Sequence, residues 1–260
     1  MIRTTSDANK VTHLKESGIE IVKGDLKDKS SLENALRGVS VVISTVSSTL
    51  SRQEGDSIQT VDEDGQINLI DAAVSAGISQ FIYVSFCGMP GEFPLQTAKR
   101  KVEKYLAESN LNYTILQPTC FMDVWLSPAL GFDYPNAKAT IYGDGKSKIS
   151  WIAIKDVASF AIASLDNPAA QNKSIALGGP AALSQLEVVT IFEGTQGKKF
   201  DLQFVSEDML RAQKEAAQDP LSESFAGLML GLVSGSEIDM KTTVDVFQMQ
   251  VTSVSDYAKR

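Results

Sequence analysis

Histidine and cysteine are scarce in this sequence of 260 residues, which contains one histidine and two cysteines. A Ser-His-Asp triad or a histidine-based zinc site would have to use His13, which lies in a polar segment typical of a surface imidazole. Cys87 and Cys120 have neither CxxC spacing nor any other metal-ligand spacing, so we interpret them as two reduced thiols. The sequence therefore predicts no metal site.

Long apolar runs and an excess of positive charge are also missing. The longest apolar stretch, 225–233, is too short to span a bilayer, and the polar start of the chain does not resemble a signal peptide. The net charge is −8, which disfavours a nucleic-acid groove because such a groove needs a basic stripe. We expect a cytoplasmic protein without membrane or nucleic-acid partners.

Strand and helix patterns alternate along the first half of the chain. Apolar β-rich runs at 39–46, 81–84 and 112–116 are separated by amphipathic segments at about 58–76 and 97–106. This alternation predicts a parallel sheet with helices on both faces, which is an α/β fold. Shorter elements are expected at 6–17 (helix), 19–22 (strand) and 29–36 (helix).

The pattern becomes less regular after residue 119. Short strand patterns at 139–142 and 149–152 surround a glycine turn, and an aromatic-rich stretch precedes them. We expect residues 1–119 to form the parallel-sheet region. Residues 120–260 are expected to form a smaller α+β lobe, with some segments returning to the sheet.

Short motifs in a fixed order carry a family resemblance. They are Gly24-Asp25-Leu26, Tyr83-Val84-Ser85, Lys99-x-x-Val-Glu103 followed by Tyr105-Leu106, Tyr113-Thr114-Ile115-Leu116-Gln117-Pro118, Gly143-Asp144-Gly145, Asp156-Val157-Ala158 and Gly179-Pro180-x-x-Leu183-Ser184. Each motif is weak alone, but the set resembles NmrA-like members of the atypical short-chain dehydrogenase/reductase superfamily, and isoflavone-reductase-type enzymes. The resemblance implies that residues 1–119 form a Rossmann-like, doubly wound parallel sheet that binds NAD(P). It also implies that the lobe of residues 120–260 serves a substrate or a partner.

The front of the implied fold is unmatched. Relatives open with a strand and a Gly-x-x-Gly-x-x-Gly turn, whose backbone amides hold the cofactor pyrophosphate, and this sequence has no such motif. Residues 1–3 align with the second strand, so we expect the first strand and helix to be missing. A fragment is favoured over a natural variant, because the absent strand would leave unpaired edges inside the sheet.

A second departure concerns the proton donor. The superfamily motif Tyr-x-x-x-Lys would place a tyrosine at position 95, where this sequence has Leu95. Lys99 is kept, and isoflavone-reductase-like relatives use this lysine without the tyrosine. Reductive chemistry is therefore weakened but not excluded.

The resemblance implies cofactor contacts at several strand ends. Arg3, with Thr4 and Ser6, follows the second strand, where a guanidinium suits the adenosine 2′-phosphate and favours NADP (NADPH) over NAD. The other implied contacts are Asp25 and Leu26 at the adenine, Ser44, Thr45 and Val46 at the ribose, and Pro118, Thr119, Cys120 and Phe121 beside the nicotinamide. Ordinary turns and strand ends are the alternative interpretation.

Lys99 and Ser85 are the implied catalytic residues. A lysine early on the helix can reach the ribose hydroxyls and polarise a carbonyl, and Ser85 is expected to face the same pocket. The alternative is that Lys99 belongs to a solvated cluster with Arg100 and Lys101. An apolar substrate cavity is expected around Phe121, Met122, Trp125 and Phe132.

Two functions remain open at this point. The first is an NADPH-dependent oxidoreductase that acts on a small apolar carbonyl or unsaturated compound, with the cofactor as hydride carrier. The second is a non-catalytic NADP-sensing regulator or assembly factor with a protein partner. An inactive fragment is a third outcome, and the chain is expected to be a monomer or a homodimer.

Overall fold

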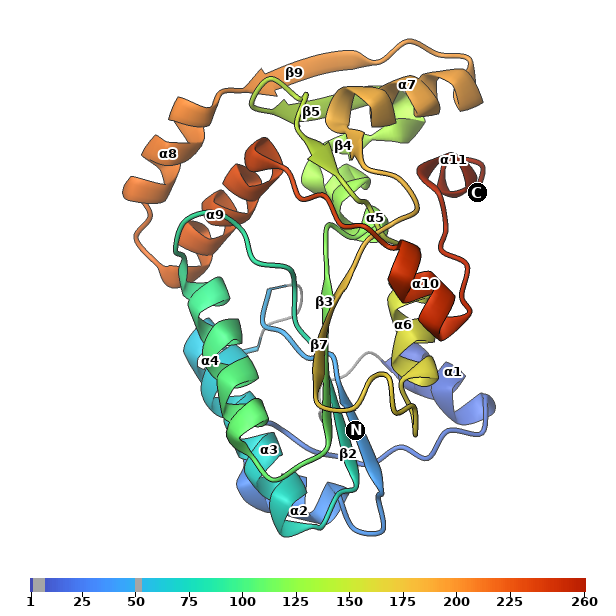
Figure 1. The fold of residues 1–260 in the computed structure, drawn as a ribbon. Helices are drawn as coiled ribbons and strands as arrows, with labels where there is room; N and C mark the ends of the chain where they lie inside the picture. Colours follow the sequence, from blue (N-terminus) through green and yellow to red (C-terminus); the bar gives the residue numbers. More distant parts are fainter. Residues whose placement is uncertain (2–7, 50–52) are drawn as a thin grey trace.

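A parallel sheet lies at the centre of the computed structural model, which describes residue 1, residues 8–49 and residues 53–260 (Figure 1). Its strand order is β1-β2-β3-β7, and all three pairings are parallel. The strands are β1 (Val41–Ser44), β2 (Gln80–Val84), β3 (Tyr113–Pro118) and β7 (Lys173–Leu177). The predicted α/β fold with a parallel sheet is thereby confirmed.

Helices cover both faces of this sheet (Figure 1). One face carries α2 (Lys29–Ala35), α3 (Asp64–Ser75) and α4 (Pro94–Glu108). The other face carries α1 (Ala8–Glu16), α6 (Ile154–Ala163) and α10 (Lys241–Phe247). This layering follows from parallel strands, which need crossover connections and are apolar on both faces.

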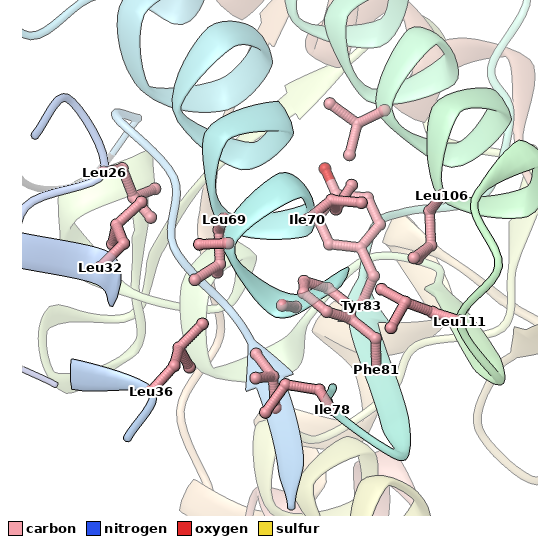
Figure 2. Close-up of a cluster of buried hydrophobic side chains, with 14 of the residues drawn as sticks. Leu26, Leu32, Leu36, Leu69, Ile70, Ile78, Phe81, Tyr83, Leu106 and Leu111 are labelled. Carbon is pink, nitrogen blue, oxygen red and sulfur yellow. The ribbon is translucent and has the colours of Figure 1, made fainter. Parts of the chain in front are cut away.

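The alternation of side chains along β2 divides the core between the two faces. Phe81 and Tyr83 are fully buried against α3 and α4, whereas Ile82 packs with the cluster under α6. Figure 2 shows the Tyr83 ring between α3 and α4, above Phe81 and beside Leu106. Burial of each such side chain contributes about 1.5–3 kcal/mol, so these contacts anchor β2 between the helices of the two faces.

The second half of the chain forms a separate small sheet of order β4-β5-β9. Its strands are β4 (Phe132–Asp133), β5 (Lys138–Tyr142) and β9 (Asp201–Val205), and the larger helices beside it are α7 (Gln185–Gln196), α8 (Glu207–Glu215) and α9 (Pro220–Ser234). The remaining elements are α5 (Met122–Trp125), η2 (Pro128–Leu130), η3 (Tyr134–Asn136), β6 (Lys148–Ile149), β8 (Leu183–Ser184) and α11 (Val254–Tyr257). Among the described residues, no helix is long and apolar enough to cross a membrane.

Three expected elements differ from the structure. Segment 19–22 is not assigned as a strand, because among the described residues no strand pairs with it, and Ile19 is 48% exposed. The helix expected at 58–76 is divided into a π-helical turn η1 (Ile58–Glu63) and α3. The helix expected from residue 97 already begins at Pro94, a residue that the first helical position accepts because it needs no amide donor.

Candidate active site at the end of strand β2

Lys99 lies on the buried face of α4. The residues of this helix that are buried are Leu95, Ala98, Lys99, Val102 and Leu106, spaced as one face of a helix. The Lys99 side chain is 6% exposed, whereas those of Arg100 and Lys101 are 34% and 55% exposed. The alternative that placed Lys99 in a solvated cluster is therefore wrong.

The surroundings of Lys99 are a carboxylate and an aromatic ring. Its Nζ lies 3.9 Å from Oδ1 of Asp62 and 5.0 Å from the centroid of the Tyr83 ring. Burial lowers the pKa of Lys99, while the negative charges of Asp62 and Glu103 oppose this change and Arg100 adds to it. The ammonium group thus gives up its proton more readily than a surface lysine does.

Asp62 belongs to η1, a π-helical turn that packs against α4. Its side chain is fully buried, and Oδ2 accepts hydrogen bonds from the Ser48 backbone N–H at 3.0 Å and from the Ser48 hydroxyl at 2.5 Å. Among the described residues, Oδ1 accepts no hydrogen bond and faces only the Lys99 ammonium group. The next residue, Glu63, pairs with Lys101 at the surface.

Two buried hydroxyls complete the cluster. The Tyr83 and Ser85 oxygens have no hydrogen-bond partner among the described residues. Burial, with Asp62 as the second cause, raises the pKa of Tyr83 well above its usual value, so the phenol stays protonated. Each unsatisfied buried polar atom costs about 1–3 kcal/mol, and this concentration of such atoms indicates a place where water or a ligand binds.

The ends of neighbouring strands meet beside these groups. Ser44 is level with Tyr83, and Val84 is level with Leu116, so the residues after β1, β2 and β3 share one edge of the sheet. Ser85 lies two residues beyond Tyr83 and faces the same side of β2. Lys99 lies over the Tyr83 ring, and Ser85 follows β2 at the carboxyl edge, so both residues are near the end of this strand. Their catalytic roles remain predictions.

The ribose residues predicted after β1 are only partly available. The Ser44 hydroxyl is buried and donates to Oε1 of Gln66 at 2.7 Å, while Nε2 of Gln66 donates to the Val46 carbonyl at 3.1 Å. Thr45 is exposed at the strand end. Of these three residues, Thr45 alone offers its side chain to a ligand.

Asp25 and Leu26 form a turn against the start of α3. Oδ1 of Asp25 accepts from the Lys27 backbone N–H at 2.9 Å, and the Asp25 N–H donates to the Ser31 hydroxyl at 2.9 Å. Leu26 is 4% exposed and lies in the core. A Cβ added to Gly65 would lie 2.8 Å from the Leu26 Cβ, so the two residues pack closely. The Leu26 side chain is a packing residue, so an adenine contact would fall to Asp25.

The residues after β3 are used mainly for packing. The Thr119 hydroxyl donates to the Ser150 carbonyl, and the Thr119 backbone N–H donates to the Leu177 carbonyl at 2.9 Å. Pro118 and Cys120 are buried, and Phe121 is half-buried and bridges to Ile152. These four residues join the sheet to the second half of the chain, and their nicotinamide role stays a prediction.

The pocket at the residues expected to line a substrate cavity holds little open space. Met122 and Phe132 are buried in the core of the second half. The pocket lined by Trp125 and Phe132 has a volume of about 20 Å³, which accommodates one water molecule at most. This expectation was wrong because the aromatic residues pack on each other, with the Phe132 and Phe192 ring centroids 4.9 Å apart.

The expected 2′-phosphate contacts cannot be compared with this geometry. Arg3, Thr4 and Ser6 lie outside the described residues. The described residues fit the nicotinamide end of a dinucleotide, because a buried cation and an unsatisfied Ser85 hydroxyl lie at the carboxyl edge of the sheet. The sequence has no glycine-rich turn for the pyrophosphate.

Sequence reasoning missed Asp62, Ser48 and Tyr83. A signal for Asp62 was present, since it follows Val61 and lies four residues after Ile58, on the apolar side of a helical segment. Burial of Ile58, Val61 and Asp62 on one turn agrees with this spacing. Its pairing with Lys99 had no sequence signal, because the two residues are brought together only by helix packing.

The sequence model of the NmrA-like family matches residues 1–258, and the chain belongs to that family. An isoflavone reductase homologue, IRL, from Zea mays is 28% identical, with 100% of this chain and 88% of the relative covered. The NAD(P)H azoreductase of Xenophilus azovorans is 27% identical (86% and 74% covered), and the photosystem II assembly factor Ycf39 of Synechocystis is 30% identical (78% and 62% covered).

Solved structures show the same fold. The NADPH-dependent quinone oxidoreductase QOR2 of Escherichia coli, in complex with NADPH, has a TM-score of 0.73 at 24% identity, with 97% of this chain and 87% of that chain covered. The triphenylmethane reductase of Citrobacter sp., in complex with NADP(H), has a TM-score of 0.76 at 20% identity, with the same coverage. The predicted NmrA-like membership and Rossmann-like fold are confirmed.

Proposed function

We propose that this protein is an NADPH-dependent reductase of a small apolar carbonyl or unsaturated compound. The observation that carries the proposal is the Lys99 ammonium group, which is buried over the Tyr83 ring near the end of β2. The Ser85 hydroxyl, just after that strand, has no hydrogen-bond partner among the described residues. Folding does not require a charged residue at this position, because an apolar residue on the same face of α4 would be buried at a lower cost in free energy. A function at the strand ends accounts for its presence.

Each residue has a chemical task in this proposal. The bound nicotinamide supplies the hydride. The Lys99 ammonium stabilises the negative charge that develops on the substrate oxygen or carbon and donates the proton to it, after which the amine takes up a proton from water. Ser85 donates a hydrogen bond to the same region. Arg3, Thr4, Ser6, Asp25 and Thr45 are proposed to hold the adenosine and ribose parts.

The relatives support this choice of chemistry. The proteins that this chain resembles include an isoflavone reductase homologue, an NAD(P)H azoreductase, a triphenylmethane reductase and an NADPH-dependent quinone oxidoreductase. Leu95, which replaces the tyrosine expected in the wider superfamily, is buried at 4% exposure, so the lysine must act without it.

Cofactor binding and turnover test the proposal separately. NADPH fluorescence should rise to saturation on titration with the protein, more steeply than that of NADH. Absorbance of NADPH at the nicotinamide band, followed with 1,4-naphthoquinone as the probe acceptor, should then fall in proportion to protein concentration. The proposal fails if neither signal changes.

A matched pair of variants assigns the role of Lys99. Lys99→Ala should reduce kcat by about a hundredfold or more and leave the Kd for NADPH within a few fold. Lys101→Ala removes a lysine from the same helix at the surface and should leave both unchanged. Equal activity of the two variants would remove Lys99 from the mechanism.

A second candidate is a non-catalytic NADP-binding assembly factor. The relationship to Ycf39, together with the absence of a tyrosine at position 95, favours it. This candidate predicts saturable NADPH binding without oxidation by quinone, azo or triphenylmethane acceptors. Affinity capture that depends on added NADP would then support a protein partner.

We further propose a cytoplasmic location, a monomer or homodimer, and a functional division near residue 119. Cell fractionation and light scattering test the first two. Expression of 120–260 alone tests the third, which predicts loss of NADPH binding in that segment. A chloroplastic relative in Arabidopsis thaliana makes the plastid the location to compare in a plant host.

A further inference from the structure

Two ion pairs join the turn η1 to helix α4, and they differ in burial. Oε1 of Glu63 lies 2.9 Å from Nζ of Lys101, and these two side chains are more exposed than those of Asp62 and Lys99. Asp62 faces Lys99 at 3.9 Å with side-chain exposures of 0% and 6%. The same two elements thus carry one ordinary surface pair and one pair that is shielded from water.

Hydrogen bonds that do not involve Lys99 fix the orientation of the Asp62 carboxylate. Both donors on Oδ2 come from Ser48, which is fully buried in the loop after β1. This arrangement turns Oδ1 toward the lysine and leaves it without any other partner among the described residues. Asp62 therefore presents one bare carboxylate oxygen to one cation.

The π-helical turn explains how adjacent residues can serve these two pairs. In a π-helix the chain widens by one residue per turn, and such turns occur frequently at functional sites. The Asp64 backbone N–H bonds to the Gln59 carbonyl, five residues earlier. The widening lets Asp62 point into the layer between β2 and α4 while Glu63 stays at its rim.

Lys99 keeps its donor protons free in this arrangement. The separation of 3.9 Å exceeds a hydrogen bond, and among the described residues Nζ makes no direct hydrogen bond. The Tyr83 ring below it and the charges of Arg100 and Glu103 on α4 are the other groups that face the ammonium. Asp62 can thus stabilise the positive charge of the ammonium group without taking up its donor protons in a hydrogen bond.

We propose that Asp62 is a positioning residue which, anchored by Ser48, holds Lys99 in its ammonium form at the end of β2 and so keeps it ready to donate a proton. This inference deepens the proposed reductase function and rests on it for its use. The ammonium itself can be measured in the free protein. Failure of one proposal is therefore distinguishable from failure of the other.

The decisive measurement is the titration of Lys99 by NMR in protein labelled at the lysine ε-carbon, with no cofactor added. The signal absent from Lys99→Arg identifies the residue. Asp62→Asn should lower the Lys99 midpoint by about one pH unit or more. Asp62→Glu should restore it toward the wild-type value, and Glu63→Gln, the matched control on the surface pair, should leave it unchanged. Coincident midpoints in wild type and Asp62→Asn overturn the inference.

A second variant keeps the inference testable where Asp62→Asn does not fold. Ser48→Ala removes one hydrogen bond from the carboxylate and keeps its charge, which strengthens the attraction for Lys99. The Lys99 midpoint should rise, and an unchanged midpoint contradicts the role of Asp62. The alkaline limb of kcat for NADPH oxidation should follow the same shifts, with KM for NADPH little changed. Shifted midpoints without any turnover retain this inference and reject the reductase.

Discussion

Lys99 is a charged residue in a layer of apolar side chains, and its partner Asp62 is buried with it. Removing water from two charges is costly, and their attraction compensates only in part. Removal of one partner destabilises the fold more than removal of both, because the remaining charge stays buried without a counter-charge. A surface pair such as Lys101–Glu63 has no such asymmetry, since water replaces the missing partner.

Lys99→Met should therefore lower the free energy of unfolding by about 3 kcal/mol, because Asp62 keeps its serine donors but loses its cation. Urea unfolding followed by circular dichroism measures this loss. Lys101→Met should cost less than about 1 kcal/mol. Addition of Asp62→Leu to Lys99→Met should recover part of the stability, and a further loss of the same size would contradict the buried-pair account.

The two cysteines are protected by burial. Burial raises the pKa of Cys87 to about 11 and that of Cys120 to about 12. Thiolate is the reactive form, so iodoacetamide at pH 8 should alkylate both more than about a hundredfold more slowly in the folded protein than in urea. Mass spectrometry of timed samples measures the rates. Equal rates with and without urea would show that the thiols are accessible.

At the scale of elements, α7 begins with a capping box. The Ser184 hydroxyl accepts from the Glu187 N–H, and Glu187 accepts from the Ser184 N–H at 2.7 Å. The Lys148 ammonium group, with that N–H as the second cause, holds the pKa of Glu187 at about 2. Strand β6, which carries Lys148, is thus joined to the start of α7.

Glu187→Gln keeps the hydrogen-bonding geometry of this cap and removes its charge. A carboxylate whose pKa is depressed in the folded state stabilises the fold at pH values above its unfolded-state pKa, near 4.5 for Glu187. This stabilisation is lost as the pH falls toward 2. The difference in unfolding free energy between wild type and Glu187→Gln should be less than about 1 kcal/mol at pH 7, since the pair is half exposed, and should vanish near pH 2. Urea unfolding across this range measures it.

The control for this cap is Glu33→Gln, on the exposed side of α2, where Glu33 makes no ion pair among the described residues. At pH 7 it should leave the free energy of unfolding within about 0.5 kcal/mol of wild type. A Glu187→Gln difference that grows as the pH falls would have the wrong sign for a depressed pKa.

At the scale of the whole molecule, the chain after β7 passes directly over the segment before α6. A Cβ added to Gly179 would lie 2.0 Å from the Trp151 carbonyl oxygen, and the Gly179 N–H donates to the Ser150 carbonyl at 3.1 Å. These are backbone atoms, so neither segment can make room by a change of side-chain rotamer. The crossing connects the main sheet to the second half of the molecule (Figure 1).

Gly179→Ala should destabilise the protein by about 3 kcal/mol or more, because two backbone segments must separate. Gly194→Ala is the matched control: it lies in α7 with open space around its Cα, and should stabilise by about 0.5–1 kcal/mol through helix propensity. Urea unfolding distinguishes the two. A neutral Gly179→Ala would mean that the crossing is looser than the structure has it.

The alternation of apolar strands with amphipathic helices determined the parallel sheet, because the period of a pattern depends only on local geometry. Motif order determined the family, and the residues after β1, β2 and β3 were predictable as one edge, because parallel strands end on the same side. Segment 19–22 shows the limit, since an apolar run becomes a strand only where another strand pairs with it, and none of the described strands pairs with this segment.

Only the tertiary structure decided which of these edge residues are free to act. Packing of η1 against α4 buried Lys99 beside Asp62, and it is this contact, between residues far apart in the chain, that distinguishes Lys99 from Lys101. Ser44 and Thr119 looked equally suitable in the sequence, yet their hydroxyls are engaged by Gln66 and Ser150. Local pattern specifies elements, whereas burial and hydrogen-bond partners arise when distant elements meet.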